Sequence, residues 1–218
     1  KKDDTAGEST STLSSNLDAT IYPELKILGK IATLCASARV SFNEEEKQWH
    51  VSGDPTEAAL LVFGQKVGFD KKEIEASEPQ ITELPFDSKL KYHLSIHKIN
   101  GKQFMTIVGA PEAIMALCST QWFSGRNLAL TAKRTDEIEK VVHSMSRKGD
   151  RVLAAAIIPA FKGELGINEV SKATFVGLFG MRDTLRVGVR EAVEAARSRG
   201  LRVVMITGDH KITAEAIA

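Results

Sequence analysis

The sequence predicts an α+β domain, an antiparallel sheet packed with helices, followed by an incomplete α/β segment. Two strand-like runs flank Asn100-Gly101, the dipeptide most typical of a tight antiparallel hairpin. Patterns with apolar residues three and four positions apart lie on both sides of this hairpin, which indicates helices packed on the sheet. Near the C-terminus a helical pattern leads into a short apolar run, an order typical of α/β proteins. We expect a connector over residues 1–18, a first domain over 19–177 and a partial second domain over 178–218.

A polar stretch and two helical patterns open the chain. Residues 1–18 are rich in serine and threonine and show no periodicity, which indicates a flexible connector. A helix is expected next, with one apolar face formed by Leu28, Ile31, Ala32 and Cys35. A second helix is expected over residues 54–67. Asp54 as its N-cap, Pro55 at the first helical position and Glu57 at the third match a capping box.

The middle of the chain predicts a hairpin and three further elements. Strands are expected over residues 91–99 and 103–108, joined by a type I′ turn at Asn100-Gly101. Pro111 suits the first position of a short helix that ends near Cys118. A later helix has apolar residues at the spacing of one face and is closed by Gly149: Ile138, Val141, Val142 and Met145. An apolar strand is then expected over residues 152–158.

The last forty residues carry the α/β signal. Val189, Ala192, Val193 and Ala196 recur on one helix face, and Gly200 stands where a left-handed C-cap is expected. The run 203–206 is apolar on both alternating faces, as in a strand covered by helices on both sides. Functional groups of such strands lie just beyond the carboxyl end. Thr207, Gly208 and Asp209 occupy that position.

Composition excludes several classes of function. A formal net charge of +1 gives no reason to expect nucleic acid or an anionic membrane surface as a partner. The two cysteines, Cys35 and Cys118, form no disulfide framework and are expected to be buried free thiols in a reducing compartment. The five histidines show no metal-ligand spacing, and no metal site is expected. Without a signal peptide or a run of about 18 apolar residues, the chain is expected to be a soluble, monomeric piece.

Several motifs together resemble the P-type ATPases, pumps that pass through an aspartyl-phosphate. The C-terminal segment is similar to the family's Asp-Pro-Pro-Arg, helix, Met-Ile-Thr-Gly-Asp pattern, with Thr184 and Leu185 in place of the prolines. Four earlier segments resemble family motifs in the required order: residues 53–60, 84–91, 108–112 and 151–154. The resemblance covers about residues 24–218, nearly the whole chain. It implies a nucleotide-binding domain followed by the start of a Rossmann-like phosphorylation domain of the haloacid-dehalogenase type.

The resemblance implies an ATP site and names its residues: Glu57, Phe86, Lys91, Gly109, Ala110 and Arg151. Phe86 would stack on adenine and Glu57 would lie beside the base, while Lys91 and Arg151 would meet phosphate oxygens. Gly109 and Ala110 would let the base or ribose approach the backbone. At position 108 the family usually has lysine and this chain has Val108.

Structural roles explain the same residues without a ligand. Phe86 could be a plain core phenylalanine, Lys91 a solvated lysine and Arg151 an exposed strand-edge arginine. Glu57 could serve only the capping box, and Gly109 could serve only the turn from strand to helix. These alternatives stay open at the level of sequence.

The resemblance also implies a phosphorylation side, used only in the whole pump. Asp183, Arg186, Thr207, Gly208 and Asp209 would surround the phosphorylated aspartate and the bound phosphate. That aspartate and the magnesium ligands have no counterparts in this sequence. Asp3-Asp4-Thr5-Ala6-Gly7 echoes the family's phosphorylated motif, but no apolar strand precedes it. The piece is therefore expected to bind ATP and not to hydrolyse it.

Three functions remain in view. The first is the cytoplasmic ATP-binding region of a membrane pump, with the pump's phosphorylation, actuator and membrane domains and Mg²⁺ as its partners. Its motifs look more like those of pumps for calcium, sodium/potassium or related light cations than like those of heavy-metal pumps. The second is a small haloacid-dehalogenase-type phosphatase, disfavoured because its Asp-x-Asp motif is absent. The third is a binding or regulatory module that has lost its nucleotide, suggested by Val108.

Overall fold

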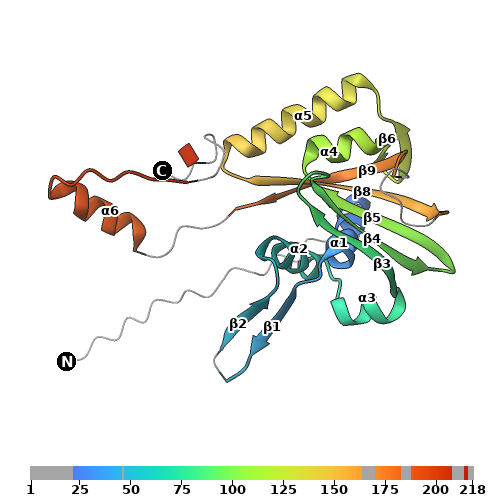
Figure 1. Cartoon of the computed structure of the whole chain (residues 1–218), viewed down its shortest axis with the longest axis horizontal. Coiled ribbons are helices and arrows are strands. Elements are labelled where there is room, and N and C mark those ends of the chain that lie inside the picture. The colour runs from blue at the N-terminus through green and yellow to red at the C-terminus, as the bar shows by residue number, and fades with distance from the viewer. Residues whose placement is uncertain (1–21, 46, 164–169, 183–187, 208–213, 216–218) are drawn as a thin grey trace.

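A seven-stranded sheet with helices on both faces forms the body of the molecule (Figure 1). The computed structural model describes residues 22–45, 47–163, 170–182, 188–207 and 214–215. The strand order is β3-β4-β5-β8-β9-β6-β7, and every neighbouring pair is antiparallel except β6 with β9. The strands are β3 Gln80–Asp87, β4 Tyr92–Ile99, β5 Lys102–Gly109, β6 Cys118–Phe123, β7 Arg126–Ala129, β8 Arg151–Phe161 and β9 Ala173–Met181.

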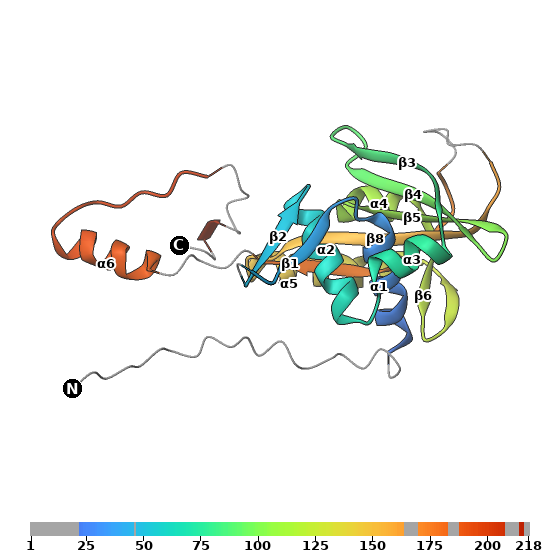
Figure 2. The ribbon, with the colours of Figure 1, turned by 90° about the horizontal axis from the view of Figure 1, so that it is seen from below.

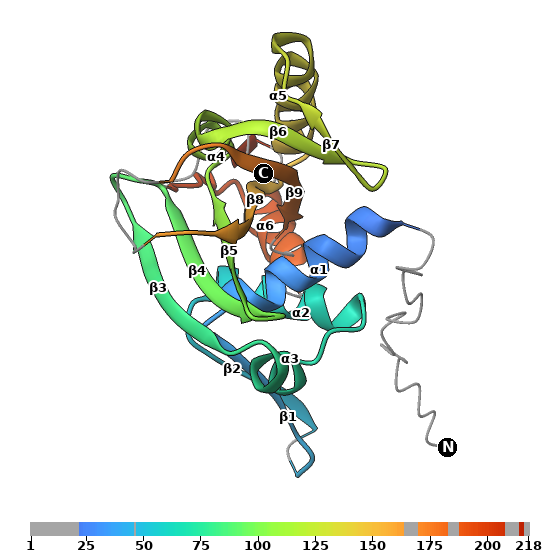
Figure 3. The same cartoon turned by 90° about the vertical axis from the view of Figure 1, so that its right-hand side faces the viewer.

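The remaining elements are helices and one separate hairpin. The helices are α1 Pro23–Cys35, α2 Pro55–Lys66, α3 Lys71–Ser77, α4 Pro111–Leu117, α5 Ala132–Arg147 and α6 Val189–Ser198. Strands β1 Arg39–Asn43 and β2 Gln48–Ser52 pair only with each other and project from the body (Figures 1 and 3). None of the helices within the described ranges is both long and apolar enough to cross a membrane.

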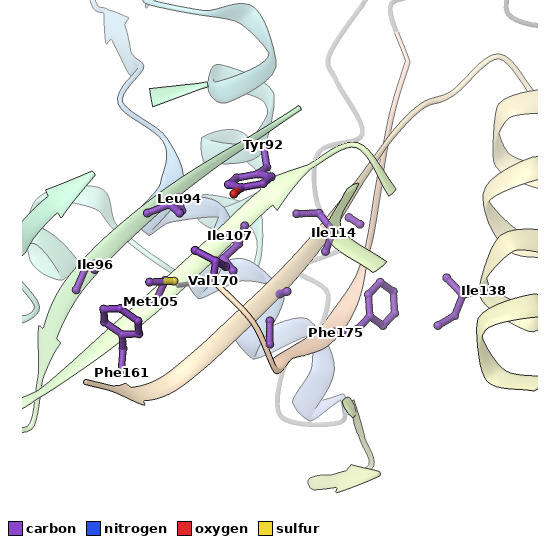
Figure 4. Close-up of a cluster of buried hydrophobic side chains, with 13 residues drawn as sticks. Tyr92, Leu94, Ile96, Met105, Ile107, Ile114, Ile138, Phe161, Val170 and Phe175 are labelled. Carbon is purple, nitrogen blue, oxygen red and sulfur yellow. The ribbon is translucent and has the colours of Figure 1, made fainter. Parts of the chain in front are cut away.

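Each face of the sheet has its own apolar core. On one face, side chains of β4, β5, β8 and β9 pack with Ile114 of α4 and Ile138 of α5 (Figure 4). On the other face, Ile31 and Cys35 of α1 and Leu60 of α2 pack against Val108 of β5. Figure 3 shows α1 and α2 lying along the sheet on this second side. Because alternate residues of a strand point to opposite faces, strands such as β5 and β8 contribute to both cores.

The predicted α+β architecture is confirmed, and its hairpin is confirmed in detail. β4 and β5 pair in unbroken register from Tyr92 with Gly109 to Ile99 with Lys102. Asn100 and Gly101 both have positive φ angles, 50° and 76°, as a type I′ turn requires. The short helix beginning at Pro111 and the strand after Gly149 also form, the latter as β8.

Several elements of the sheet were not predicted. β3 supplies the edge strand beside β4, and its pairing is interrupted by two register shifts. β6, β7 and β9 extend the other half of the sheet. β9 spans Ala173–Met181, so the predicted domain boundary between residues 177 and 178 falls inside a strand that pairs with β8.

The strand predicted over residues 203–206 is wrong for this structure. Val203, Val204, Met205 and Ile206 are in no strand, and Ile206 is 94% exposed. A strand needs a neighbour for its backbone hydrogen bonds, and no strand of the described ranges pairs with this run. The preceding α6 forms as predicted but has no buried residue, and it lies apart from the sheet (Figures 1 and 2). The Rossmann-like arrangement is therefore not formed among the described residues.

Candidate functional site

A pocket of about 240 Å³ opens where α1 and α2 meet the sheet. Its walls come from six places: the end of α1, the start of α2, and strands β3, β4, β5 and β8. Four of the predicted nucleotide-binding residues line it: Glu57, Phe86, Gly109 and Arg151. These residues are distant in sequence. The β3-β4-β5-β8 order of the sheet brings the strands of Phe86, Gly109 and Arg151 together, and α2, which packs on the sheet, carries Glu57.

Phe86 stands at the pocket with most of its ring in solvent. It belongs to β3, and its side chain is 63% exposed, which excludes the alternative of a core phenylalanine. Leu84 from the same strand packs against the core instead. An exposed aromatic ring beside a pocket can stack on a flat ligand. When the pocket holds no ligand, the ring simply faces solvent.

Glu57 does not complete the predicted capping box. Its Oε2 accepts hydrogen bonds from the backbone N–H groups of Ser37 at 2.9 Å and Ala38 at 3.0 Å. The carboxylate therefore orders the segment between α1 and β1 rather than the backbone of Asp54. These two hydrogen bonds hold the carboxylate of Glu57, which lines the pocket, against the backbone of Ser37 and Ala38.

Asp54 forms the predicted N-cap of α2 and also lines the pocket. Its Oδ1 accepts from the backbone N–H groups of Thr56 at 2.7 Å and Glu57 at 3.2 Å. Partial burial raises its pKa, but the hydrogen bonds from Glu57 and Thr56, together with the charge of Arg151, hold the pKa below its usual value. The pocket therefore contains a carboxylate that is ionised at neutral pH, beside Arg151.

Gly109 is required by a close approach within the chain. A Cβ atom on Gly109 would lie 2.4 Å from the backbone oxygen of Lys91. That oxygen also accepts a hydrogen bond, 2.9 Å long, from the backbone N–H of Ala110, the N-cap of α4. The strand-to-helix turn alone thus explains the glycine, although Gly109 also borders the pocket. Ala110 is not among the lining residues.

Lys91 lies elsewhere than the sequence predicts. The sequence predicts it as the first residue of the strand over 91–99, but it has a φ angle of 60° and ends the turn before β4, which begins at Tyr92. Asp87 builds this turn, because its Oδ1 accepts from the N–H groups of Lys89 and Leu90. The Nζ atom of Lys91 forms a 3.0 Å ion pair with Glu112 of α4 and is not among the pocket's lining atoms. This hydrogen bond lowers the pKa of Glu112.

Arg151 begins β8 and brings a permanent positive charge to the pocket. It is exposed, and its neighbours Asp150 and Arg182 form an ion pair of 2.9 Å. That pair occupies the carboxylate of Asp150, the acid next to Arg151 in the sequence. Arg151 is therefore placed to meet an anionic part of a ligand at the pocket's mouth.

One residue that lines the pocket, His93, was not predicted for the site. His93 of β4 lines the pocket and is only 8% exposed, although its spacing from the other histidines indicates no metal site. Val108 pairs with it across the hairpin and is 5% exposed. The signal for His93 was the alternation in β4, where His93, Ser95 and His97 share one face. Polar residues at every second position of a buried strand mark a face that meets polar groups.

The predicted phosphorylation-side residues cannot be brought together here. Asp183, Arg186, Gly208 and Asp209 lie outside the described residues. Thr207 is described and exposed, in the irregular stretch after α6. Within the described ranges, no group of three or more histidine, cysteine or acidic residues is arranged to hold a metal ion.

Comparison with known proteins decides the family. The family model for the P-type ATPase cytoplasmic domain N matches residues 24–188. The chain belongs to the P-type ATPases. The pocket, Phe86 and the Gly109 turn therefore lie within the part of this P-type ATPase chain that matches domain N.

Curated P-type ATPases resemble the chain over most of its length. Calcium-transporting ATPase 1 of Lactococcus lactis subsp. lactis (strain IL1403) is 31% identical over 88% of this chain and 22% of its own length. The sodium/potassium-transporting ATPase subunit alpha of Drosophila melanogaster is 34% identical over 90% of this chain and 20% of its own. Potassium-transporting ATPase alpha chain 2 of Oryctolagus cuniculus is 36% identical over 88% of this chain and 19% of its own length. The chain thus spans about a fifth of the length of these relatives.

Proposed function

We propose that the pocket binds ATP and that the chain is the ATP-binding cytoplasmic region of a P-type cation-transporting ATPase. In that role it positions ATP for phosphorylation of an aspartate outside the 218 residues. The observation that carries the proposal is the convergence of Phe86, Glu57 and Arg151 on one pocket. An aromatic platform, a carboxylate acceptor and a guanidinium match the base, its exocyclic amine and the phosphates of a nucleotide.

The pocket's shape supports one orientation of the nucleotide. Its inner wall is apolar or neutral at Leu60, Val108 and Leu153, while Arg151 is exposed. The base therefore enters beside Phe86 and Glu57, and the phosphates remain toward Arg151 and solvent. An anion placed at the inner wall would lose its hydration without gaining a charged partner.

The wider function follows from the relatives' names. The matched proteins are calcium-transporting, sodium/potassium-transporting and potassium-transporting ATPases. We propose that this chain serves a pump of that kind at the cytoplasmic face of a membrane, with the phosphorylation, actuator and membrane domains of the same pump as its partners. Mg²⁺ would accompany ATP in the whole pump, and we assign it no ligand among the described residues.

Titration of the chain with ATP tests the proposal. We expect a Kd of roughly 0.1 to several mM, because the pocket offers one stacking ring and few cations. Backbone amide shifts measured by NMR should cluster around Glu57, Phe86, Gly109 and Arg151. Shifts that scatter over the surface, or that are absent at about 10 mM ATP, would reject the proposal.

A binding module without a nucleotide is the second candidate. Two observations favour it: Val108 brings no positive charge to the pocket, and Lys91 is paired with Glu112. The same titration separates the two candidates, because the module would give no saturable shift at the pocket with ATP.

A further inference from the structure

His93 occupies the inner, base-binding end of the proposed ATP site. It lies on β4 opposite Val108, on the sheet face covered by α1 and α2. Glu57 and Phe86 line the same pocket. A base stacked on Phe86 would therefore have its edge near His93 and Glu57, two hydrogen-bonding side chains that line the pocket with Phe86.

Burial keeps the ring of His93 neutral at pH 7. Burial lowers its pKa, and the carboxylates of Glu57 and Glu83 only partly offset this effect. Its Nε2 lies 3.7 Å from Oε2 of Glu83, on the neighbouring strand β3. From α1 the pocket receives Cys35, a neutral thiol whose pKa burial raises to about 11. Asp54 at the start of α2 and Arg151 of β8 are the remaining charged residues that line the pocket.

The neighbouring carboxylate determines which ring nitrogen carries the proton. A neutral imidazole has one N–H and one acceptor nitrogen, and a carboxylate beside Nε2 favours the proton on Nε2. Nδ1 is then left as an acceptor. Together with the Glu57 carboxylate, His93 gives the base end of the pocket two acceptors and therefore complements a donor on the ligand.

We propose that His93 determines the base preference of the pocket, accepting a hydrogen bond from the exocyclic amine of a 6-aminopurine and disfavouring a 6-oxopurine. Adenine carries an amine at that position, whereas hypoxanthine and guanine carry an oxygen that would face two acceptors. The inference rests on the proposed function, because it assumes that the base lies beside Phe86.

Comparison of ATP with ITP tests the inference. The two nucleotides share ribose and phosphates, so the ratio of their dissociation constants isolates the edge of the base. Wild-type chain should prefer ATP by about tenfold or more, because an unpaired polar group discriminates strongly at a buried edge. His93→Phe should reduce this preference by about three- to tenfold, the effect of one hydrogen bond.

The pH dependence provides a readout that a purely structural role would not give. When the pH is lowered from about 8, protonation of His93 turns its acceptor into a donor, at a pH below the ordinary 6.5 because burial lowers its pKa. The ATP preference of the wild-type chain should then decrease, because a protonated ring suits the 6-oxo group of ITP. Protonation of the phosphates affects both nucleotides alike and cancels in the ratio.

Two glutamine variants complete the design. His93→Gln should keep most of the ATP preference, since its amide oxygen can accept, but should lose the pH dependence. His97→Gln is the matched control: His97 lies on the same strand face and is buried, yet it bonds Ser95 and the Glu78 carbonyl and does not line the pocket. It should retain both the preference and its pH dependence.

The outcomes separate the two proposals. If wild-type chain binds neither nucleotide, the ATP site itself is rejected. If it binds ATP but its preference is independent of pH, or if His93→Phe weakens ATP and ITP equally, the role of His93 is overturned. The wild-type pH profile needs no variant, so the test survives a His93→Phe protein that fails to fold.

Discussion

Phe86 is the residue on which base recognition in the proposed site depends most. Its ring is 63% exposed, so Phe86→Ala leaves no buried cavity and should change the free energy of unfolding by no more than about 0.5 kcal/mol. Stacking of a base on an aromatic ring is worth roughly 1–3 kcal/mol. We therefore expect ATP, ADP and AMP to bind about five- to a hundredfold more weakly.

Calorimetric affinities and melting temperatures of the same variant check this prediction. Phe42→Ala is the control, because Phe42 is also exposed but lies on β1, away from the pocket. A Phe86→Ala chain with unchanged affinity for all three nucleotides would remove the ring from the site.

Lys91 is predicted to contact phosphate, and its ion pair with Glu112 sharpens the test. Lys91→Ala should weaken ATP more than AMP, by about two- to tenfold, because a phosphate contact disappears with the phosphates. Glu112→Gln should have the opposite effect, since it releases the Nζ atom now held at 3.0 Å. Lys89→Ala, in the same turn, is the control. Equal losses for ATP and AMP in Lys91→Ala would contradict a phosphate contact.

At the scale of elements, two helices offer a matched pair of caps. Asp54 of α2 and Asp70 of α3 each accept hydrogen bonds from the second and third backbone N–H groups of their helix. Replacing either by alanine should cost about 1 kcal/mol of stability. Only Asp54 lines the pocket, so only Asp54→Ala should also strengthen ATP binding, by removing a negative charge beside Arg151.

Chemical unfolding and nucleotide titration of both variants distinguish the cap from the site. Parallel stability losses with a change in affinity only for Asp54→Ala are expected. A change of the same size in Asp70→Ala would show that the affinity follows stability rather than the charge in the pocket.

Local signals predicted some elements and missed others for physical reasons. The Asn100-Gly101 dipeptide predicted the β4–β5 hairpin and Pro111 predicted the start of α4, because turn and cap geometry depend on a few neighbouring residues. β3 was missed because Pro85 interrupts its strand pattern and its pairing is irregular. The apolar run at 203–206 predicted a strand, but a strand forms only where another pairs with it.

At the site, too, local sequence motifs predicted some features and missed others. Sequence motifs predicted Glu57, Phe86, Gly109 and Arg151 for the site, and all four line one pocket. The sheet order brings the last three together, and the packing of α2 on the sheet adds Glu57. The motifs could not reveal that Lys91 is turned toward Glu112, because that depends on the position of α4. Nor could they reveal that Glu57 binds the backbone of Ser37 and Ala38, a contact across some twenty residues of chain.

At the scale of the whole molecule, the chain should bind ATP without consuming it. The family's phosphorylated motif, Asp-Lys-Thr-Gly-Thr, does not occur in the 218 residues. Incubation with labelled ATP and Mg²⁺ should therefore release no phosphate above background and leave no acid-stable phosphoenzyme. Label found on Asp3 or Asp4 would overturn this prediction and give the N-terminal echo of that motif a function.

The last prediction concerns the pH dependence of folding, which the buried histidines control. Burial lowers the pKa of both His93 and His97 below the ordinary 6.5, against the raising effects of Glu83 and of the Glu78 carbonyl. Below that pH the unfolded chain binds more protons than the folded chain. The contribution of the two histidines to the free energy of unfolding is therefore fully present above about pH 6.5 and declines as the pH falls. The loss is at most about 1.4 kcal/mol per pH unit for each histidine. Asp54 and Glu112 have lowered pKa values and affect stability only in more acidic solution.

Urea unfolding at pH values from about 7 to about 5 measures this decline. His97→Gln should flatten it, because one of the two buried groups no longer titrates. His143→Gln, an exposed position on α5, should leave the wild-type slope unchanged. Since His97 lies outside the pocket, His97→Gln should change the slope for folding but not the pH dependence of the ATP preference, whereas His93→Gln should change both. A free energy of unfolding that stays constant or rises on acidification over this range would mean that neither histidine is held neutral by burial.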